Sequence, residues 1–105
     1  MKFGLVDTTI DQINAIFGKH PQIEKVIIYG SRAKGNFKNG SDIDLTLRGT
    51  GLTLAIINRI EMELEELYLP YTFDLSIYDQ ISDKDLVEHI DTIGIVFYER
   101  PKQLP

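Results

Sequence analysis

The amino-acid sequence predicts a small mixed β-sheet backed by helices, in the α/β (α+β) class. Short runs of β-branched and apolar residues alternate with longer segments whose apolar residues recur at helical spacing. About a dozen residues without a full helix join the first two runs, which favours an antiparallel pair. The connection to the third run contains a long helix, as a parallel crossover requires, so both kinds of pairing are expected in one sheet.

The first half of the chain is predicted to supply a helix, two strands and a short helical turn. Apolar residues on one helical face predict the first helix, with Thr8 or Thr9 capping its start. A β-branched run then predicts a buried strand, and a loop rich in Gly and Asn separates the helical turn from the second strand. In chain order these elements cover residues 5–17, 23–29, 31–34 and 42–48.

The second half is predicted to add a long amphipathic helix, a strand, another helix and a short apolar segment. Pro70 follows the long helix, and the strand after it alternates apolar with polar residues. Ser82 is the expected N-terminal cap of the last helix, with Asp85 at the capping-box position. The apolar tail is interpreted as an edge strand. These elements cover residues 54–67, 71–78, 82–90 and 93–98.

Length and composition indicate one domain, residues 1–105, of ordinary globular character. The formal net charge of −5 argues against a broad nucleic-acid-binding surface, which is normally basic, and is compatible with a protein partner or a small substrate. No cysteine is present, which excludes disulfides, thiolate metal sites and a thiol nucleophile. The sequence has neither a signal-peptide pattern nor an apolar run of membrane-spanning length, so a cytoplasmic location is expected.

The most informative feature of the sequence is the pair Gly30-Ser31 followed by Asp42 and Asp44. Side chains two residues apart point the same way along a strand, so both carboxylates are expected to face one point. Converging carboxylates repel one another unless a cation lies between them, and Mg²⁺ prefers oxygen ligands. The Gly-Ser turn offers backbone amides and a hydroxyl, which are groups that hold phosphates. A metal site beside a phosphate site indicates nucleotide chemistry.

Asp74 is expected to complete this acidic site. It lies on the third predicted strand, which can pair with the second strand and so bring Asp74 beside Asp42 and Asp44. Three carboxylates around one point are the usual protein contribution to a two-metal phosphoryl-transfer site. Asp42 and Asp44 would bridge two Mg²⁺ ions, whereas Asp74 would complete the site of an attacking hydroxyl and act as its general base.

The residues of the Gly-Ser turn are the candidate nucleotide ligands. Gly30 and Ser31 are expected to hold the β- and γ-phosphates of a nucleoside triphosphate. Arg32 or Lys34 would neutralise the charge that builds on the leaving pyrophosphate, and the sequence does not decide between them. No metal role is assigned to either histidine, because neither His20 nor His89 has a companion at ligand spacing.

These motifs together resemble the core motif of the DNA polymerase β-like nucleotidyltransferase superfamily, in which Gly-Ser precedes Asp-x-Asp and a later third Asp. Residues 30–35 and 41–45 look more closely like the minimal nucleotidyltransferase (MNT) family, and residues 73–75 and 93–99 extend the likeness over nearly the whole chain. The resemblance implies a polymerase β-like fold and an MntA-type antitoxin of a HEPN-domain ribonuclease toxin. It also implies Mg²⁺-dependent transfer of AMP from ATP to a hydroxyl, often of a tyrosine, on that toxin. All three acidic positions of the pattern are filled, as expected of an active enzyme.

The length of the chain bears on the acceptor. Transferases that modify a small acceptor usually need additional structure to bind it, and here the nucleotidyltransferase core accounts for essentially every residue. The acceptor is therefore expected to be presented by another molecule or by a second copy of the chain. A protein acceptor fits the acidic composition better than RNA does.

Two other functions remain open at this point. The chain would be a binding module if it blocked its partner stoichiometrically, without catalysis. It would be a small-molecule nucleotidyltransferase if a separate subunit bound the acceptor. Dimerisation or assembly with a partner is compatible with the many apolar residues. Several aromatic residues form either an apolar docking patch or ordinary core, with core the preferred interpretation: Tyr68, Tyr71, Tyr78, Phe97 and Tyr98.

Overall fold

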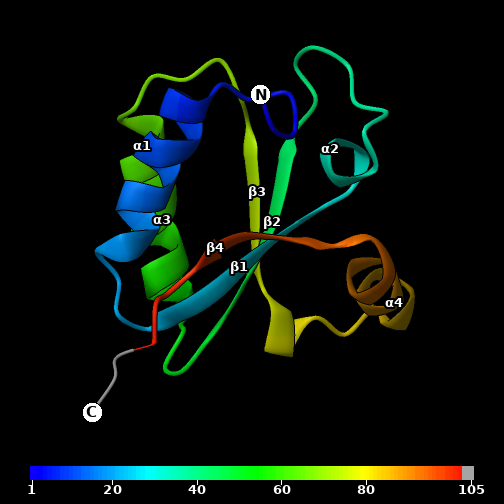
Figure 1. Cartoon of the computed structure of the whole chain (residues 1–105). Helices are drawn as coiled ribbons and strands as arrows, with labels where there is room; N and C mark the ends of the chain where they lie inside the picture. The colour runs from blue at the N-terminus through cyan, green and yellow to red at the C-terminus, as the bar shows by residue number, and fades with distance from the viewer. Residues whose placement is uncertain (103–105) are drawn as a thin grey trace.

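A four-stranded sheet in the order β3-β2-β1-β4 forms the centre of the structure, a computed structural model that describes residues 1–102 (Figure 1). The strands are β1 (Ile23–Tyr29), β2 (Ile43–Gly49), β3 (Phe73–Ile77) and β4 (Ile95–Glu99). The helices are α1 (Asp7–Gly18), α2 (Ser31–Lys34), α3 (Leu54–Glu65) and α4 (Lys84–Ile93), with a 3-10 turn, η1 (Tyr78–Gln80), after β3. Residues 103–105 of the predicted domain lie outside the described residues.

The sheet is mixed, as the connection lengths predict. Strand β1 pairs antiparallel with β2 on one side and with β4 on the other. Strand β2 pairs in parallel with β3, and α3 makes the crossover between them. The expected edge strand is present as β4, which begins at Ile95 and ends at Glu99. The predicted α+β class and strand pairing are therefore confirmed.

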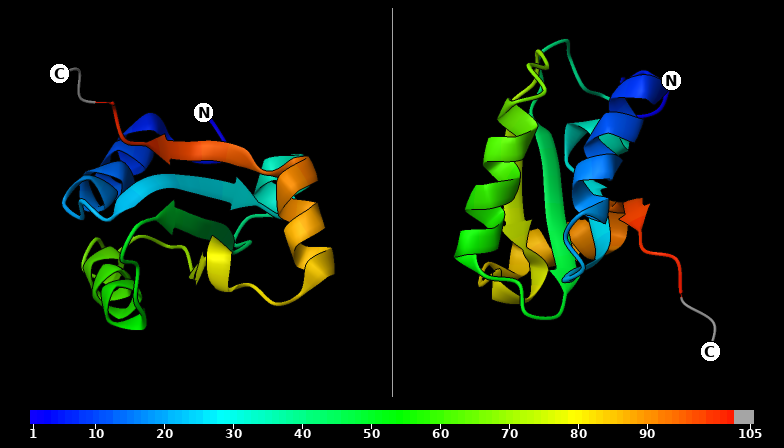
Figure 2. Two further views of the ribbon diagram at one scale, coloured as in Figure 1. Left: turned by 90° about the horizontal axis from the view of Figure 1, so that it is seen from below. Right: turned by 90° about the vertical axis from the view of Figure 1, so that its left-hand side faces the viewer.

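The helices lie on both sides of the sheet. Figure 1 shows α1 and α3 side by side on one side of it and α2 and α4 on the other, and the views of Figure 2 agree. Along β2, Ile43, Leu45 and Leu47 are fully buried and belong to one apolar core with residues of α1 and α3. Because side chains alternate along a strand, Asp44 faces the opposite side, where it is only half-buried.

The start of α1 differs from the prediction. The helix begins at Asp7, and its N-cap is Val6, which makes no side-chain capping bond. Thr8 and Thr9 lie inside the first turn, and Thr9 is buried there. The prediction of a threonine cap is wrong because Thr9 packs against the protein instead of remaining at the end of the helix.

The cap of α4 is also shifted by one residue. Asp83, and not Ser82, occupies the N-cap position, where its Oδ1 accepts from the amides of Asp85 (3.0 Å) and Leu86 (3.3 Å). Two neighbouring residues with good capping side chains compete here, and the carboxylate also interacts favourably with the positive end of the helix dipole.

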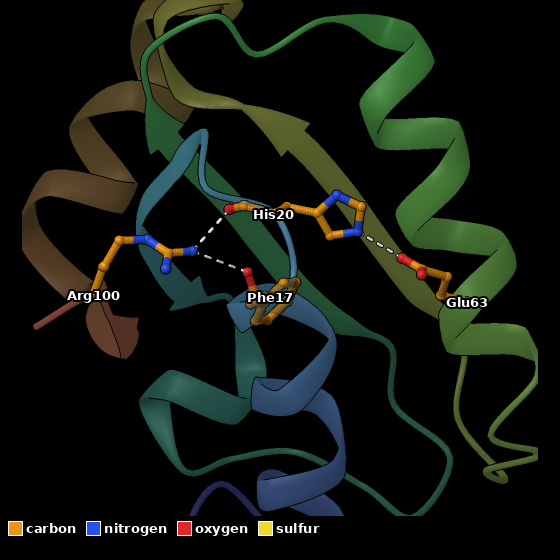
Figure 3. A network of polar contacts seen from close by, with 4 residues as sticks. All are labelled: Phe17, His20, Glu63 and Arg100. Carbon is orange, nitrogen blue, oxygen red and sulfur yellow. Dashed lines mark hydrogen bonds and ion pairs between the residues drawn. The ribbon is translucent and has the colours of Figure 1, made fainter.

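Arg100, directly after β4, joins the end of the sheet to the end of α1 (Figure 3). Its guanidinium donates to the carbonyl oxygens of His20 (2.8 Å), Phe17 (3.3 Å) and Ile23 (2.8 Å). The side chain of His20 points the other way and pairs with Glu63 of α3, with 2.6 Å between Nε2 and Oε1. One arginine therefore adds charged donors to carbonyl groups of the turn between α1 and β1, where those of Phe17 and His20 also accept backbone N–H groups.

None of the helices within residues 1–102 combines the length and apolar character needed to cross a lipid bilayer.

Candidate functional site

Three strands bring the predicted site residues together. The parallel register of β2 and β3 places Asp44 directly beside Asp74, and Asp44 also pairs with Tyr29 at the end of β1. Asp42 precedes the first residue of β2 and is exposed, as is Asp74. The predicted meeting of the second and third strands at their acidic residues is thus confirmed at the level of the backbone.

The ionisation of Asp44 reflects this crowding. Burial raises the pKa of its carboxyl above the ordinary value, and the nearby charges of Asp74 and then Asp42 raise the pKa further. His89 and Arg32 act in the opposite direction. The carboxylates of the three aspartates therefore interact electrostatically, which favours a cation between them.

Gly30 brings the backbone at the end of β1 against Asp44. Its φ of +75° is a conformation that side-chain-bearing residues rarely adopt. A Cβ atom on Gly30 would lie 2.3 Å from Oδ2 of Asp44, so only glycine allows this approach. The Gly-Ser turn and the acidic pair, ten residues apart in the sequence, are consequently parts of one site.

Ser31 and Lys34 begin and end the short helix α2 beside this turn. Ser31 is half-buried and Lys34 is exposed. Their roles as nucleotide ligands stay predictions. No contact in the structure tests those roles.

Arg32 has a different environment from the one predicted. Its side chain is only 3% exposed. The guanidinium donates to the carbonyl oxygen of Ser41 through Nε (3.1 Å) and Nη2 (2.9 Å), and to that of Phe3 through Nη1 (2.8 Å). The guanidinium also lies over two aromatic rings, with its Cζ 5.1 Å from the ring centroid of Phe37 and 5.0 Å from that of Tyr71.

These contacts engage all three nitrogens of Arg32 and fix the loop that ends at Asp42. The structure therefore favours a supporting role for Arg32 over neutralisation of a leaving phosphate. Of the two cations that the sequence offers, Lys34 is the one exposed to solvent.

His89 of α4 is a site residue that the sequence analysis missed. Its Nε2 accepts the backbone N–H of Gly30 at 3.2 Å, and its ring packs edge-on against Tyr29 with 6.1 Å between centroids. A signal for it exists in the sequence, because His89 directly precedes buried Ile90 and follows Leu86 by three residues. This spacing places His89 on the inner side of an amphipathic helix, where an imidazole needs a hydrogen-bond partner.

The donor set suits a hard divalent cation, although its side chains are not gathered around one point. Within residues 1–102, no three acidic or histidine side chains are arranged closely enough to hold a metal ion. The donors themselves are carboxylate oxygens, which Mg²⁺ prefers. Burial first, and then the charges of Asp74 and Asp42, raise the pKa of Asp44. Asp42 and Asp74 are exposed, so their carboxylates are open to a cation from solvent.

Solved structures of other proteins share this fold. A crystal structure of a toxin–antitoxin with AMP-PNP matches with a TM-score of 0.70 and 18% identity, over 91% of this chain and 75% of that one. A crystal structure of the toxin–antitoxin MntA–HepT matches with a TM-score of 0.67 and 14% identity, over 90% and 74%. The complex of a tri-AMPylated Shewanella oneidensis HEPN toxin with its MNT antitoxin matches with a TM-score of 0.65 and 15% identity, over 89% and 71%. At these identities the likeness shows a shared fold.

The sequence itself carries the family assignment. It matches none of the curated proteins with which it was compared. Residues 11–103, however, match the family described as polymerase beta, nucleotidyltransferase. The matched region includes the Gly-Ser turn, all three aspartates and His89. The chain therefore belongs to the polymerase beta nucleotidyltransferase family.

Proposed function

We propose that this nucleotidyltransferase is an MNT-type antitoxin that transfers AMP from ATP to a hydroxyl, that of a tyrosine, on a HEPN-type toxin. The observation that carries the proposal is the register of β2 and β3, which sets Asp44 beside Asp74 with Gly30 packed against Asp44. The fold of toxin–antitoxin complexes supports it, since one of them contains AMP-PNP and another an AMPylated toxin.

The three aspartates are assigned to the reacting end of the nucleotide. Asp42 and Asp44 would hold Mg²⁺, and Asp74 would complete the site near the acceptor. When bound, the metal supplies positive charge that stabilises the triphosphate and activates the hydroxyl. Burial and then repulsion raise the pKa of Asp44, so a bound cation would stabilise its ionised form.

The transfer exchanges one phosphorus–oxygen bond for another. The hydroxyl oxygen of the acceptor forms a bond to the α-phosphorus of ATP, and the bond from the α-phosphorus to the bridging oxygen breaks, releasing pyrophosphate. The proton of the hydroxyl passes to the carboxylate of Asp74, which is exposed and open to the acceptor.

The Gly-Ser turn is assigned to the triphosphate. Gly30 donates its amide to His89, so its contribution is the absence of a side chain, which allows close approach to Asp44. The hydroxyl of Ser31 and the ammonium of Lys34 would contact the phosphates, because both groups are accessible on α2.

The test is to incubate the purified chain with ATP, Mg²⁺ and a purified HEPN-domain partner, and to measure the intact mass of both proteins. A gain of one or more AMP units on the partner is expected. The gain should be lost in Asp44→Asn and retained in Asp79→Asn, which removes an exposed carboxylate on η1.

Stoichiometry separates catalysis from simple blocking. A transferase inactivates a molar excess of toxin when ATP is present. Inactivation of one equivalent only, unchanged by ATP and by Asp44→Asn, would contradict the catalytic proposal and identify a binding module. Transfer to a small hydroxyl compound but not to the protein would contradict the proposed acceptor.

A further inference from the structure

A groove of about 550 Å³ lies between the C-terminal half of α3 and the segment that leads into β3. We call it the α3–β3 groove. Its lining combines two carboxylates with aromatic and apolar side chains: Glu61, Glu65, Tyr68, Leu69, Tyr71 and Phe73. This surface is distinct from the acidic site, because Phe73 and Asp74 are consecutive and point to opposite faces of β3.

Tyr68 on this groove is unfavourable for the fold in two ways. Its φ of +54° lies in the left-handed region, where glycine is strongly preferred. Its side chain is nevertheless 90% exposed, so little packing offsets the strain. By contrast, Phe97 is buried, Tyr98 packs against the core, and Tyr78 donates a hydrogen bond to Asp91. Tyr68 thus differs from Phe97 and Tyr98, which pack in the core, and from Tyr78, which is hydrogen-bonded at the surface.

The charges along the groove are also unfavourable for the helix that carries them. Glu61 and Glu65 lie one turn apart near the C-terminus of α3, where the helix dipole is already negative. The last turn contains no basic residue. Among the described residues, Glu63 pairs with His20, but neither Glu61 nor Glu65 forms an ion pair. Two repelling carboxylates beside an exposed, strained tyrosine indicate a binding surface and not a stabilising one.

The groove is connected to the site through its aromatic lining. Tyr71 packs on the guanidinium of Arg32, which in turn holds the carbonyl of Ser41 next to Asp42. A molecule seated in the groove would therefore lie next to two segments that carry site carboxylates.

We propose that the α3–β3 groove docks a basic polypeptide segment of the acceptor protein. Lys or Arg side chains of that segment pair with Glu61 and Glu65, and their apolar stems pack on Tyr68. That this segment belongs to the AMP acceptor rests on the proposed function. The groove's preference for a basic polypeptide rests only on its own charge and lining.

The test is a titration of the isotope-labelled full chain with two 12-residue peptides of otherwise equal composition, one of alternating Arg and Leu and one of alternating Glu and Leu. The Arg peptide is expected to shift backbone amide signals of residues 61–73, with an affinity that falls as salt is added. The Glu peptide should leave these signals unchanged.

Matched variants locate the binding. Tyr68→Gly is expected to weaken the Arg peptide about tenfold without lowering the melting temperature, because glycine relieves the left-handed strain. Glu65→Lys should weaken binding of the Arg peptide by a similar factor. Two controls should bind like wild type: Met62→Ala, at an exposed apolar residue of α3, and Glu24→Lys, which makes the same charge change at an exposed position of β1.

Several outcomes would overturn the inference. They are failure of the Arg peptide to bind, equal binding of the Glu peptide, and unchanged affinity in Tyr68→Gly and Glu65→Lys. None of these depends on catalysis. Loss of AMP transfer with intact peptide binding would count against the proposed function alone, and intact transfer without peptide binding would count against the groove alone.

Discussion

The side chain of Asp44 keeps its observed direction only while residue 30 is glycine, because a Cβ atom on Gly30 would lie 2.3 Å from Oδ2 of Asp44. The atom in conflict is at the end of a short, rotatable side chain. A larger residue at position 30 would therefore be accommodated by turning the Asp44 carboxylate away. The contact matters less for the stability of the fold than for the direction of that carboxylate.

Replacing Gly30 by alanine should separate stability from activity. Gly35→Ala is the matched control, because Gly35 also has a positive φ (+87°) but no atom lies within 4 Å of a Cβ placed there. Each variant is expected to lose about 1 kcal/mol of unfolding free energy to backbone strain. Only Gly30→Ala should abolish AMP transfer. Urea denaturation and transfer rates check this, and equal rates in the two variants would contradict the assigned role of Gly30.

Asp44→Asn should stabilise the metal-free protein at neutral pH. The folded-state pKa of Asp44 is raised, so the wild-type unfolding free energy falls as pH increases from about 4 through that raised pKa. Asparagine does not ionise, so the unfolding free energy of the variant does not fall for this reason. We expect a gain of less than about 1 kcal/mol at pH 7, since solvent screens a partly exposed group. Denaturation in EDTA between pH 3 and pH 8 measures it, and the two curves should converge below about pH 4. If Asp44→Asn were less stable than the wild type at pH 7, the view that the ionised Asp44 carboxylate destabilises the metal-free fold would be contradicted.

His89 should act through its hydrogen bond to Gly30 as well as through packing. His89→Phe keeps a ring against Tyr29 but leaves the Gly30 amide without its acceptor, which costs about 1 kcal/mol or more. His89→Gln places an oxygen at a similar reach to Nε2 and should restore part of both stability and transfer rate. Equal stability and equal transfer in the Phe variant and wild type would show that the hydrogen bond is unimportant.

Substitution of Arg32 should mainly lower the stability of the fold, whereas substitution of Lys34 should mainly weaken ATP binding. Arg32→Lys removes the fork that spans the carbonyls of Ser41 and Phe3 in a buried site, and we expect a loss of about 2–4 kcal/mol of unfolding free energy. Lys34→Ala changes an exposed side chain, with less than about 0.5 kcal/mol expected. Lys34→Ala should instead weaken the binding of ATP about tenfold, as measured by calorimetry. Unchanged ATP affinity would remove Lys34 from the site.

The features that the sequence predicts well are those set by local patterns. Connection lengths determine which strands pair in parallel, and the alternation of Phe73, Asp74 and Leu75 determines which face of β3 is acidic. These two local properties suffice to bring Asp74 beside Asp44. The cap of α4 is not predicted correctly because Ser82 and Asp83 are neighbours of similar capping ability. At α1 the helix begins after Val6, which offers no capping side chain, and the packing of Thr9 inside the first turn is not visible in the local pattern.

The features that sequence reasoning misses depend on distant backbone groups. Arg32 binds the carbonyls of Phe3 and Ser41, and carbonyl groups leave no mark on the pattern of side chains. A cation beside a phosphate motif was therefore interpreted as a phosphate ligand. His89 reaches Gly30 across 59 residues of sequence, and no local pattern indicates that α4 returns to the end of β1.

The contacts of Arg100 set a condition on when the protein can become active during its synthesis. Its partners lie 77 to 83 residues earlier, at the end of α1 and the start of β1, and the central strand β1 lacks its outer neighbour until β4 exists. Such distant pairings form late, because the intervening chain must be ordered first. A ribosome-bound chain shorter than about 100 residues would leave β1 as an open edge. Nucleotide transfer is thus expected only after Arg100 has left the ribosome.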